Sequence, residues 1–227
     1  MAGPSLHPCK RIKAPPESPT QLQSTARLFG AMDRKAVGPS PTFARAHLLM
    51  AFLTIAERGT IGRHALAEET GLGEGSIRTV LKRLRDAGLA DSAASGCRLT
   101  RRGQEAYSAI STVLSPTTLI EGTRLTMGSS QVAISIRGGA ARVRSGIEQR
   151  DSAIGVGAAG ATTYIVRGSR FTIPGGSDDC ERDFPGKAWG ALRRKLRPGD
   201  GDAIIVCGAD GEGTASLGAF SAALSLL

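Results

Sequence analysis

The sequence predicts an α+β protein: a small helical unit with one short hairpin, followed by a small two-layer α+β domain. Between residues 42 and 114, apolar residues recur mostly at helical spacing. From residue 118 to 227, short strand patterns alternate with helical ones, which indicates a sheet with helices over one face. We therefore expect two domains, at 42–114 and 118–227.

The first 40 residues are rich in proline and basic residues and show no sustained apolar period. Such a segment has little apolar surface to bury, so we expect residues 1–40 to form a disordered basic tail. The whole chain carries 29 Lys and Arg against 20 Asp and Glu, a formal net charge of +9. A positive chain is attracted to polyanions, among which double-stranded DNA is the expected partner.

Three helices are expected at the start of the first domain. Residues 43–56 are apolar on nearly all sides, so this helix belongs in a core. Residues 63–70 form a second helix that ends at Gly71, because glycine readily adopts the left-handed conformation that closes helices. A third helix spans 76–87, with the hydroxyl of Ser76 as its N-cap.

A short hairpin follows the third helix, with strands over 89–92 and 97–100, and a fourth helix covers 101–114. Two helices joined by a tight turn, the second one basic, and then a hairpin are typical of a winged helix-turn-helix. The first domain is therefore interpreted as a DNA-binding domain.

The third helix is amphipathic in a way that suits this function. Its aliphatic residues recur at i, i+3, i+4 and i+7, whereas four of the six residues on the opposite arc are cationic. Arg78 and Thr79 lie in the first turns, where recognition helices reach base edges, and the later cations are placed to contact phosphates. The expected DNA-binding residues are Ser76, Arg78, Thr79, Lys82, Arg83, Arg85 and, on the hairpin, Arg98.

The residues over 71–81 and 99–105 resemble those of an archaeal family of winged helix-turn-helix transcription regulators. The second domain is similar to the same family over 150–154 and 201–206. The resemblance implies a transcription regulator whose C-terminal domain is a GAD-like α+β sheet of unassigned function. It covers about 43–227 and names no ligand.

The second domain is expected to contain four strands and three helices. The strands are placed at 132–137, 161–166, 171–173 and 203–207, and the helices at 147–154, 187–196 and 214–227, the last capped by Thr214. The first strand alternates apolar and polar residues, so we expect it to be half-buried. Arg150 and Asp151 are candidate contacts for an unidentified small-molecule effector, although a structural role is favoured, in which they pair with each other or cap their helix. The domain is expected to provide homodimerisation, effector sensing or both.

The sequence gives no pattern for catalysis, a metal or a cofactor. The four cysteines are isolated, and the three histidines all lie within the first 64 residues. Residues 155–160 match G-x-G-x-x-G, but a helical segment precedes them and a strand follows, which inverts the dinucleotide-binding context. No apolar run is long enough for a membrane span. We therefore expect a cytoplasmic protein that is not an enzyme.

Two other functions stay open at this point. The chain could be a small-molecule-binding protein or an enzyme with a winged-helix appendage, because its second domain is rich in glycine loops. It could also be a protein-interaction module, since winged helices are also used to contact proteins.

Overall fold

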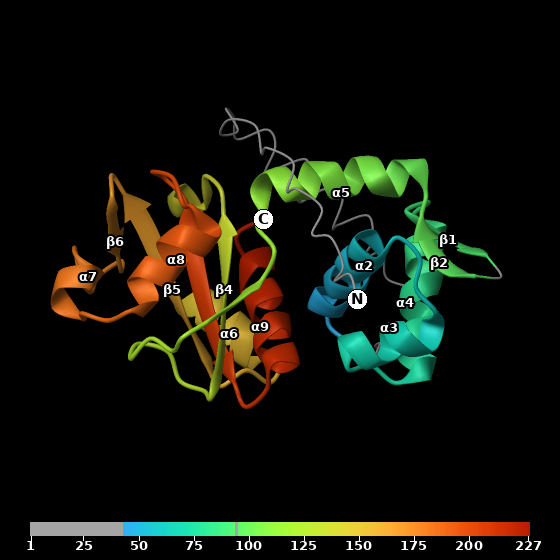
Figure 1. Ribbon diagram of the computed structural model, residues 1–227, viewed down its shortest axis with the longest axis horizontal. Coiled ribbons are helices and arrows are strands. Elements are labelled where there is room, and N and C mark those ends of the chain that lie inside the picture. Colours follow the sequence, from blue (N-terminus) through green and yellow to red (C-terminus); the bar gives the residue numbers. More distant parts are fainter. Residues whose placement is uncertain (1–42, 94) are drawn as a thin grey trace, which may run out of the picture.

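The computed structural model describes residues 43–93 and 95–227, and the expected tail over 1–40 lies outside them. The elements form two lobes (Figure 1), one of helices with a hairpin and one built on a larger sheet. Helix α5 (Arg101–Val113) runs from the first lobe to the second. The α+β class expected from the sequence is confirmed.

Three helices begin the first lobe: α2 (Arg45–Arg58), α3 (Arg63–Thr70) and α4 (Glu74–Asp86). α2 buries residues around most of its circumference, as its apolar sequence predicts. α3 ends at Gly71, which has a left-handed backbone with φ of 69° and donates its N–H to carbonyls at the helix end.

The predictions that Ser76 and Thr214 cap their helices are wrong. α4 begins two residues before Ser76, with Gly73 as its N-cap, and α9 (Glu212–Leu224) begins two residues before Thr214, with Gly211 as its N-cap. Both glycines have extended backbones, and each is followed directly by a glutamate in the first helical turn. Glycine is a tolerated N-cap, and the carboxylate that follows it interacts favourably with the positive end of the helix dipole. Both helices therefore begin without a hydroxyl side chain at the N-cap.

The hairpin pairs β1 (Ala90–Ala93) with β2 (Gly96–Leu99) in antiparallel register. A β-bridge between Ile61 and Cys97 adds the α2–α3 connection to this small sheet. Thr100 is the N-cap of α5, and its hydroxyl oxygen accepts a hydrogen bond from the Gly103 N–H at 3.0 Å. The elements therefore follow in the predicted order, with one additional short contact at the sheet edge.

The second lobe contains a five-stranded sheet with the order β3-β4-β7-β5-β6, in which all neighbouring strands are antiparallel. Its strands are β3 (Thr118–Ile120), β4 (Ser130–Ile136), β5 (Gly160–Arg167), β6 (Arg170–Thr172) and β7 (Ala203–Ala209). β7 comes last in the chain and is inserted between β4 and β5, so both central pairings are long-range.

Helices pack on both faces of this sheet, so the expectation that they cover one face only is wrong. One face meets α6 (Ile147–Ile154) and α9, and a short 3₁₀ turn (Gly139–Arg142) follows β4. The other face meets α8 (Ala188–Leu196), and the brief α7 (Cys180–Asp183) lies beside β6. The domain therefore has three layers rather than two.

For the same reason β4 is not half-buried as predicted. Ile134 belongs to the core on the α9 side, and Ala133 belongs to the core with Trp189 on the other side. Ser135, a polar residue that suggested a solvent face, is buried as well. So is Gln131, just before the predicted strand, whose side chain accepts a hydrogen bond from the Thr123 N–H at 2.8 Å. Polar side chains that find partners inside a fold cannot be told from exposed ones by alternation alone.

The two lobes contact each other through α2 and α9, and one continuous apolar cluster includes residues of both helices. α2 also packs against α4. Since α2 contacts both α9 and α4, it links the second lobe to α4. Figure 1 shows α4 and the hairpin at the end of the molecule away from the larger sheet.

Candidate nucleic-acid interface

α4 separates its side chains into a buried and an exposed set, as its sequence predicts. Ile77, Val80, Leu81 and Leu84 are buried against the neighbouring elements. Arg78, Thr79, Lys82 and Arg85 are exposed. Because the aliphatic side anchors the helix, the cationic side chains are left pointing into solvent.

Three of these cations lie on one face, since Arg78, Lys82 and Arg85 follow at intervals of four and three residues. They line a groove of about 490 Å³ together with Arg63 from the start of α3 and residues of the hairpin, among them Gly96. Helix, helix start and hairpin thus contribute to one concave basic surface, which we call the α4 groove. Asp86, near the end of α4, forms an ion pair with Lys82 of the groove at 2.7 Å. Both side chains are more than 60% exposed, so this pair is weak and open to exchange for another anion.

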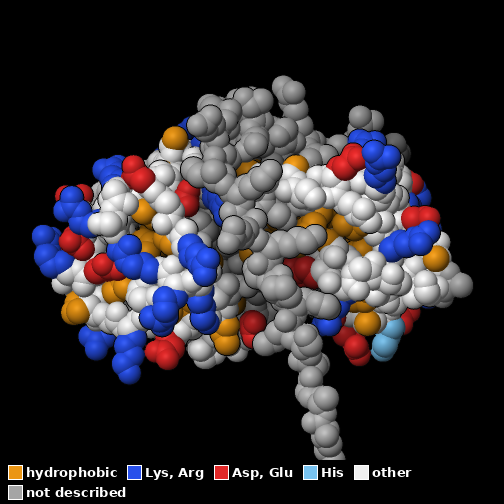
Figure 2. Space-filling model, turned by 45° about the horizontal axis from the view of Figure 1, so that its top comes forward, with side chains coloured by type: hydrophobic (Ala, Val, Ile, Leu, Met, Phe, Trp, Pro, Cys, Tyr) orange, Lys and Arg blue, Asp and Glu red, His pale blue; other side chains and the backbone are white. Residues whose placement is uncertain are grey.

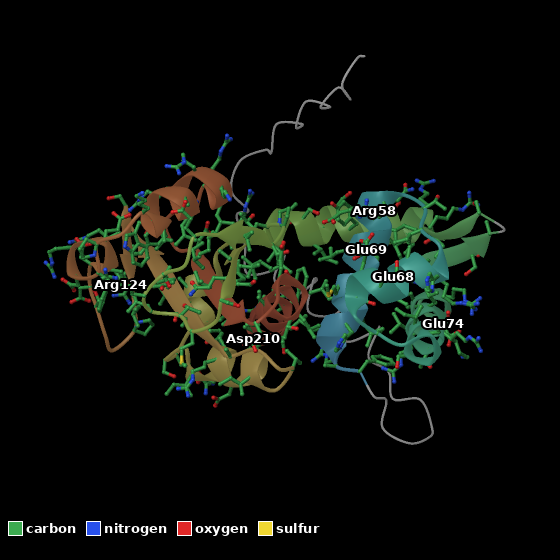
Figure 3. All side chains as sticks on the ribbon, turned by 60° about the horizontal axis from the view of Figure 1, so that its bottom comes forward. Arg58, Glu68, Glu69, Glu74, Arg124 and Asp210 are labelled. Carbon is green, nitrogen blue, oxygen red and sulfur yellow. The ribbon has the colours of Figure 1, made fainter. Side chains whose placement is uncertain are left out.

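The beginning of α4 has mixed charge. Glu74 lies in its first turn, close to Glu68 of α3 (Figure 3). His64 lies between them, with its ring nitrogens 3.5 Å from the Glu68 carboxylate and 3.6 Å from that of Glu74. The cationic face therefore occupies the middle and end of α4, and its first turn carries a carboxylate.

Arg83 was predicted to contact phosphate, but its guanidinium lies over the Phe43 ring, 5.2 Å from the ring centroid. Its side chain is only partly exposed, and Arg83 is absent from the residues that line the α4 groove. A helical wheel separates Arg83 from Arg78 by about 140°, so both can be cationic without sharing a face. Ser76, also predicted to contact DNA, lies on the same side as Arg83 and is partly exposed.

Thr79 and Arg98 are exposed as expected but lie outside the α4 groove. The Thr79 hydroxyl donates to the Gly75 carbonyl at 3.3 Å. Arg98 stands opposite Asp91 on the hairpin, whereas the preceding Cys97 lines the groove.

Sequence reasoning missed Arg63 and the hairpin backbone as parts of this surface. The connection between α2 and α3 is held to the hairpin by the bridge from Ile61 to Cys97, which brings the start of α3 beside the groove. The only sequence signal for this short strand is weak: a β-branched pair between two glycines, in Gly59-Thr60-Ile61-Gly62.

Arg150 and Asp151, the candidate effector contacts, lie on α6 in the second lobe and are exposed. They are far along the chain from the α4 groove and take no part in it. Positive charge is not confined to α4 either, because Lys and Arg side chains also gather on the lobe of the sheet, at the left of Figure 2. Charge alone therefore does not single out α4, and the groove geometry does.

Outside the α4 groove, the Cys207 thiol and the Tyr164 hydroxyl are both buried. No group of three or more His, Cys, Asp or Glu side chains is arranged to hold a metal ion among residues 43–93 and 95–227. Burial raises the pKa of the Cys207 thiol to about 12 and that of the Tyr164 hydroxyl to about 12, so both stay protonated at neutral pH. In the same ranges no helix is both long enough and apolar enough to cross a bilayer.

Two parts of the chain match known domain families. Residues 48–105 match the PH0730-like, N-terminal domain, and residues 127–226 match a domain of unknown function, DUF4443. The fold is similar to the solved structure titled "Hypothetical protein PH0730 from Pyrococcus horikoshii OT3", with a TM-score of 0.63 and 24% sequence identity over 80% of this chain and 91% of that one. No curated protein matches the sequence. The expected resemblance is thus found in part, as matches to two domain families and as a fold shared with a protein of Pyrococcus horikoshii.

Proposed function

We propose that this chain is a transcription regulator that binds double-stranded DNA through a winged helix-turn-helix, with α4 as the recognition helix and the β1–β2 hairpin as the wing. The observation that carries the proposal is the α4 groove, in which Arg78, Lys82 and Arg85 share one exposed face beside the hairpin. An α-helix enters the major groove of B-form DNA, and a wing beside it contacts the backbone.

The positions along α4 suggest different roles for its cations. Arg78 is closest to the start of the helix, where side chains reach base edges, and its guanidinium suits the two acceptors of guanine. Lys82 and Arg85 lie further along the same face and are placed to neutralise phosphates. Glu74 would repel a phosphate but can accept a hydrogen bond from the cytosine amino group, which favours inserting this end of α4 toward the bases.

Among the described residues, the second lobe does not cover this surface. α4 packs on α2, α3 and the hairpin, and the main contact between the lobes is made by α2 with α9. We propose that the second lobe provides homodimerisation, effector sensing or both, and that the protein acts by binding rather than by catalysis. A dimer would present two α4 helices to half-sites about one helical turn apart.

A mobility-shift assay with DNA from upstream of the protein's own gene, in the presence of random competitor DNA, tests base reading by Arg78. We expect Arg78→Ala to reduce the preference for this DNA over the competitor by about fivefold or more, since one bidentate base contact contributes about 1–3 kcal/mol. The matched control is Arg167→Ala, which removes one exposed arginine from the second lobe and should leave the preference unchanged. Equal preference in both variants and the wild type would remove Arg78 from base reading.

A further inference from the structure

The outward face of α6 combines apolar and charged side chains that have no role in the fold itself. Gln149 and Ala153 face the core, whereas Ile147, Arg150, Asp151 and Ile154 are exposed. At ~100° per residue, these four exposed side chains fall within an arc of about 100°. They therefore form one continuous stripe along the solvent side of the helix, which we call the α6 stripe.

The two isoleucines at the ends of the α6 stripe are unusually accessible. Ile147 is 57% exposed and Ile154 is 42% exposed, and they are two of only five large hydrophobic side chains exposed among the described residues. Two such residues one heptad apart on a single short helix form an apolar surface that water solvates poorly. They place one apolar contact at each end of the stripe.

The two charged residues between the isoleucines are both exposed to solvent. Within the part of the chain that the structure describes, no ion pair involves the side chain of Arg150 or that of Asp151. Glu148, by contrast, is engaged locally, since the Ser145 hydroxyl donates to its carboxylate at 3.2 Å. The α6 stripe thus offers one cation and one anion, side by side, to an external partner.

The order of these residues makes the stripe complementary to itself. A twofold axis that passes between Arg150 and Asp151, with two α6 helices antiparallel, places Ile147 opposite Ile154 of the second copy. The same axis places Arg150 opposite Asp151 of the second copy, and both contacts occur twice by symmetry. We infer that the α6 stripe is the contact through which two copies of this chain form a twofold dimer.

A second copy fits the stripe better than an unrelated partner because a single symmetry operation satisfies all four residues at once. An eight-residue helix is small compared with the total of about 1,200–2,000 Å² buried in a standard interface. The stripe would therefore form the centre of the contact, and the dimer should exchange with monomer as concentration changes. This inference deepens the proposed function, because it states how two α4 helices are brought to one DNA site.

Sedimentation velocity of the full chain without DNA tests the inference, so its outcome does not depend on whether DNA is bound. The wild type should sediment increasingly as a dimer as concentration rises. R150D and D151R should each shift the equilibrium at least tenfold toward monomer, because each places like charges opposite each other twice. The double exchange R150D/D151R should restore the dimer, since opposite charges then face each other again.

Two further variants separate the stripe from a general effect of surface changes. I147S/I154S should weaken the dimer, whereas Leu119→Ser, which alters a 48% exposed leucine of β3, should not. All altered residues are exposed, and circular dichroism checks that each variant is folded. A monomeric wild type, a double exchange as monomeric as the single ones, or an unaffected I147S/I154S dimer would each overturn the inference. If dimerisation fails while DNA binding through α4 persists, the proposed function stands and only the stripe is excluded.

Discussion

Ile61 and Cys97 are joined by two backbone hydrogen bonds, from Ile61 N to Cys97 O at 3.0 Å and from Cys97 N to Ile61 O at 2.8 Å. This pair holds the connection before α3 to the hairpin, beside the α4 groove that Arg63 and Gly96 both line. The basic surface therefore depends on a contact that lies outside the regular strands.

Gly96→Ala tests this contact. Gly96 has φ of 130°, and an added Cβ would come within 2.6 Å of the Ile61 carbonyl oxygen. We expect the free energy of unfolding to fall by about 1–3 kcal/mol, because the backbone is strained and the bridge is displaced. Denaturant unfolding measures the loss. Gly75→Ala is the control, since no atom lies within 4 Å of its added Cβ in α4 and a gain in helix propensity is expected; equal stability changes in both variants would contradict the prediction.

Thr100→Ala tests the joint between the hairpin and α5. The Thr100 hydroxyl donates to the Gly88 carbonyl at 2.7 Å and accepts from the Gly103 N–H at 3.0 Å, so it joins the end of α4 to the start of α5. We expect a loss of about 1–2 kcal/mol in unfolding free energy, in the range of a lost N-cap. Thr112→Ala removes an exposed hydroxyl that bonds only the Ala109 carbonyl, and it should cost less than half as much. Thermal unfolding of the two variants measures both losses, and an equal loss in Thr112→Ala would contradict the joining role of Thr100.

Arg83 and Arg85 should separate stability from DNA binding. Arg83 lies over the Phe43 ring, and Arg85 lines the α4 groove. Arg83→Ala should lower the unfolding free energy by about 0.5–1 kcal/mol and change DNA affinity little. Arg85→Ala should do the reverse, because it removes a phosphate contact and no packing. Both quantities need to be measured for each variant, and a larger loss of DNA affinity in Arg83→Ala would show that Phe43 does not hold this arginine.

Tyr164 should make the protein less stable in alkali. Burial raises its pKa from 10.0 to about 12, so the folded state keeps the proton to higher pH than the unfolded state does. The stabilisation is complete below the unfolded pKa and decreases as pH rises toward the folded one. Tyr164→Phe lacks this titration, so its unfolding free energy relative to the wild type should rise by about 1 kcal/mol between about pH 9 and pH 11. A constant difference across this range would show that the hydroxyl ionises equally in both states.

The sequence predicts best those elements whose own residues determine them. The limits of α3 and α6 agree with the structure because apolar spacing and flanking glycines act locally. The starts of α4 and α9 were misplaced because a nearby hydroxyl looked like the better cap than glycine. The second helical layer was missed because it depends on where the strands lie, and Tyr164 meets Trp189 of α8 only after long-range pairing.

The candidate site was predicted only in part for a related reason. The exposed positions of Arg78, Lys82 and Arg85 follow from the periodicity of α4 itself. Arg83 could not be separated from them by its charge, because its contact with Phe43 joins two different segments of the chain. The contribution of Arg63 likewise needs the packing of α3 beside the hairpin.

The salt dependence of DNA binding tests the central claim most directly, with the wild type compared with Lys82→Ala/Arg85→Ala and with the control Arg167→Ala/Arg170→Ala. If α4 contacts phosphates, the logarithm of the binding constant falls steeply with the logarithm of salt concentration in the wild type. The slope should become shallower by about two in the α4 variant, because two phosphate contacts are lost, and stay unchanged in the control. A slope that is equal in all three proteins, or that changes only in the control, would contradict DNA binding through α4.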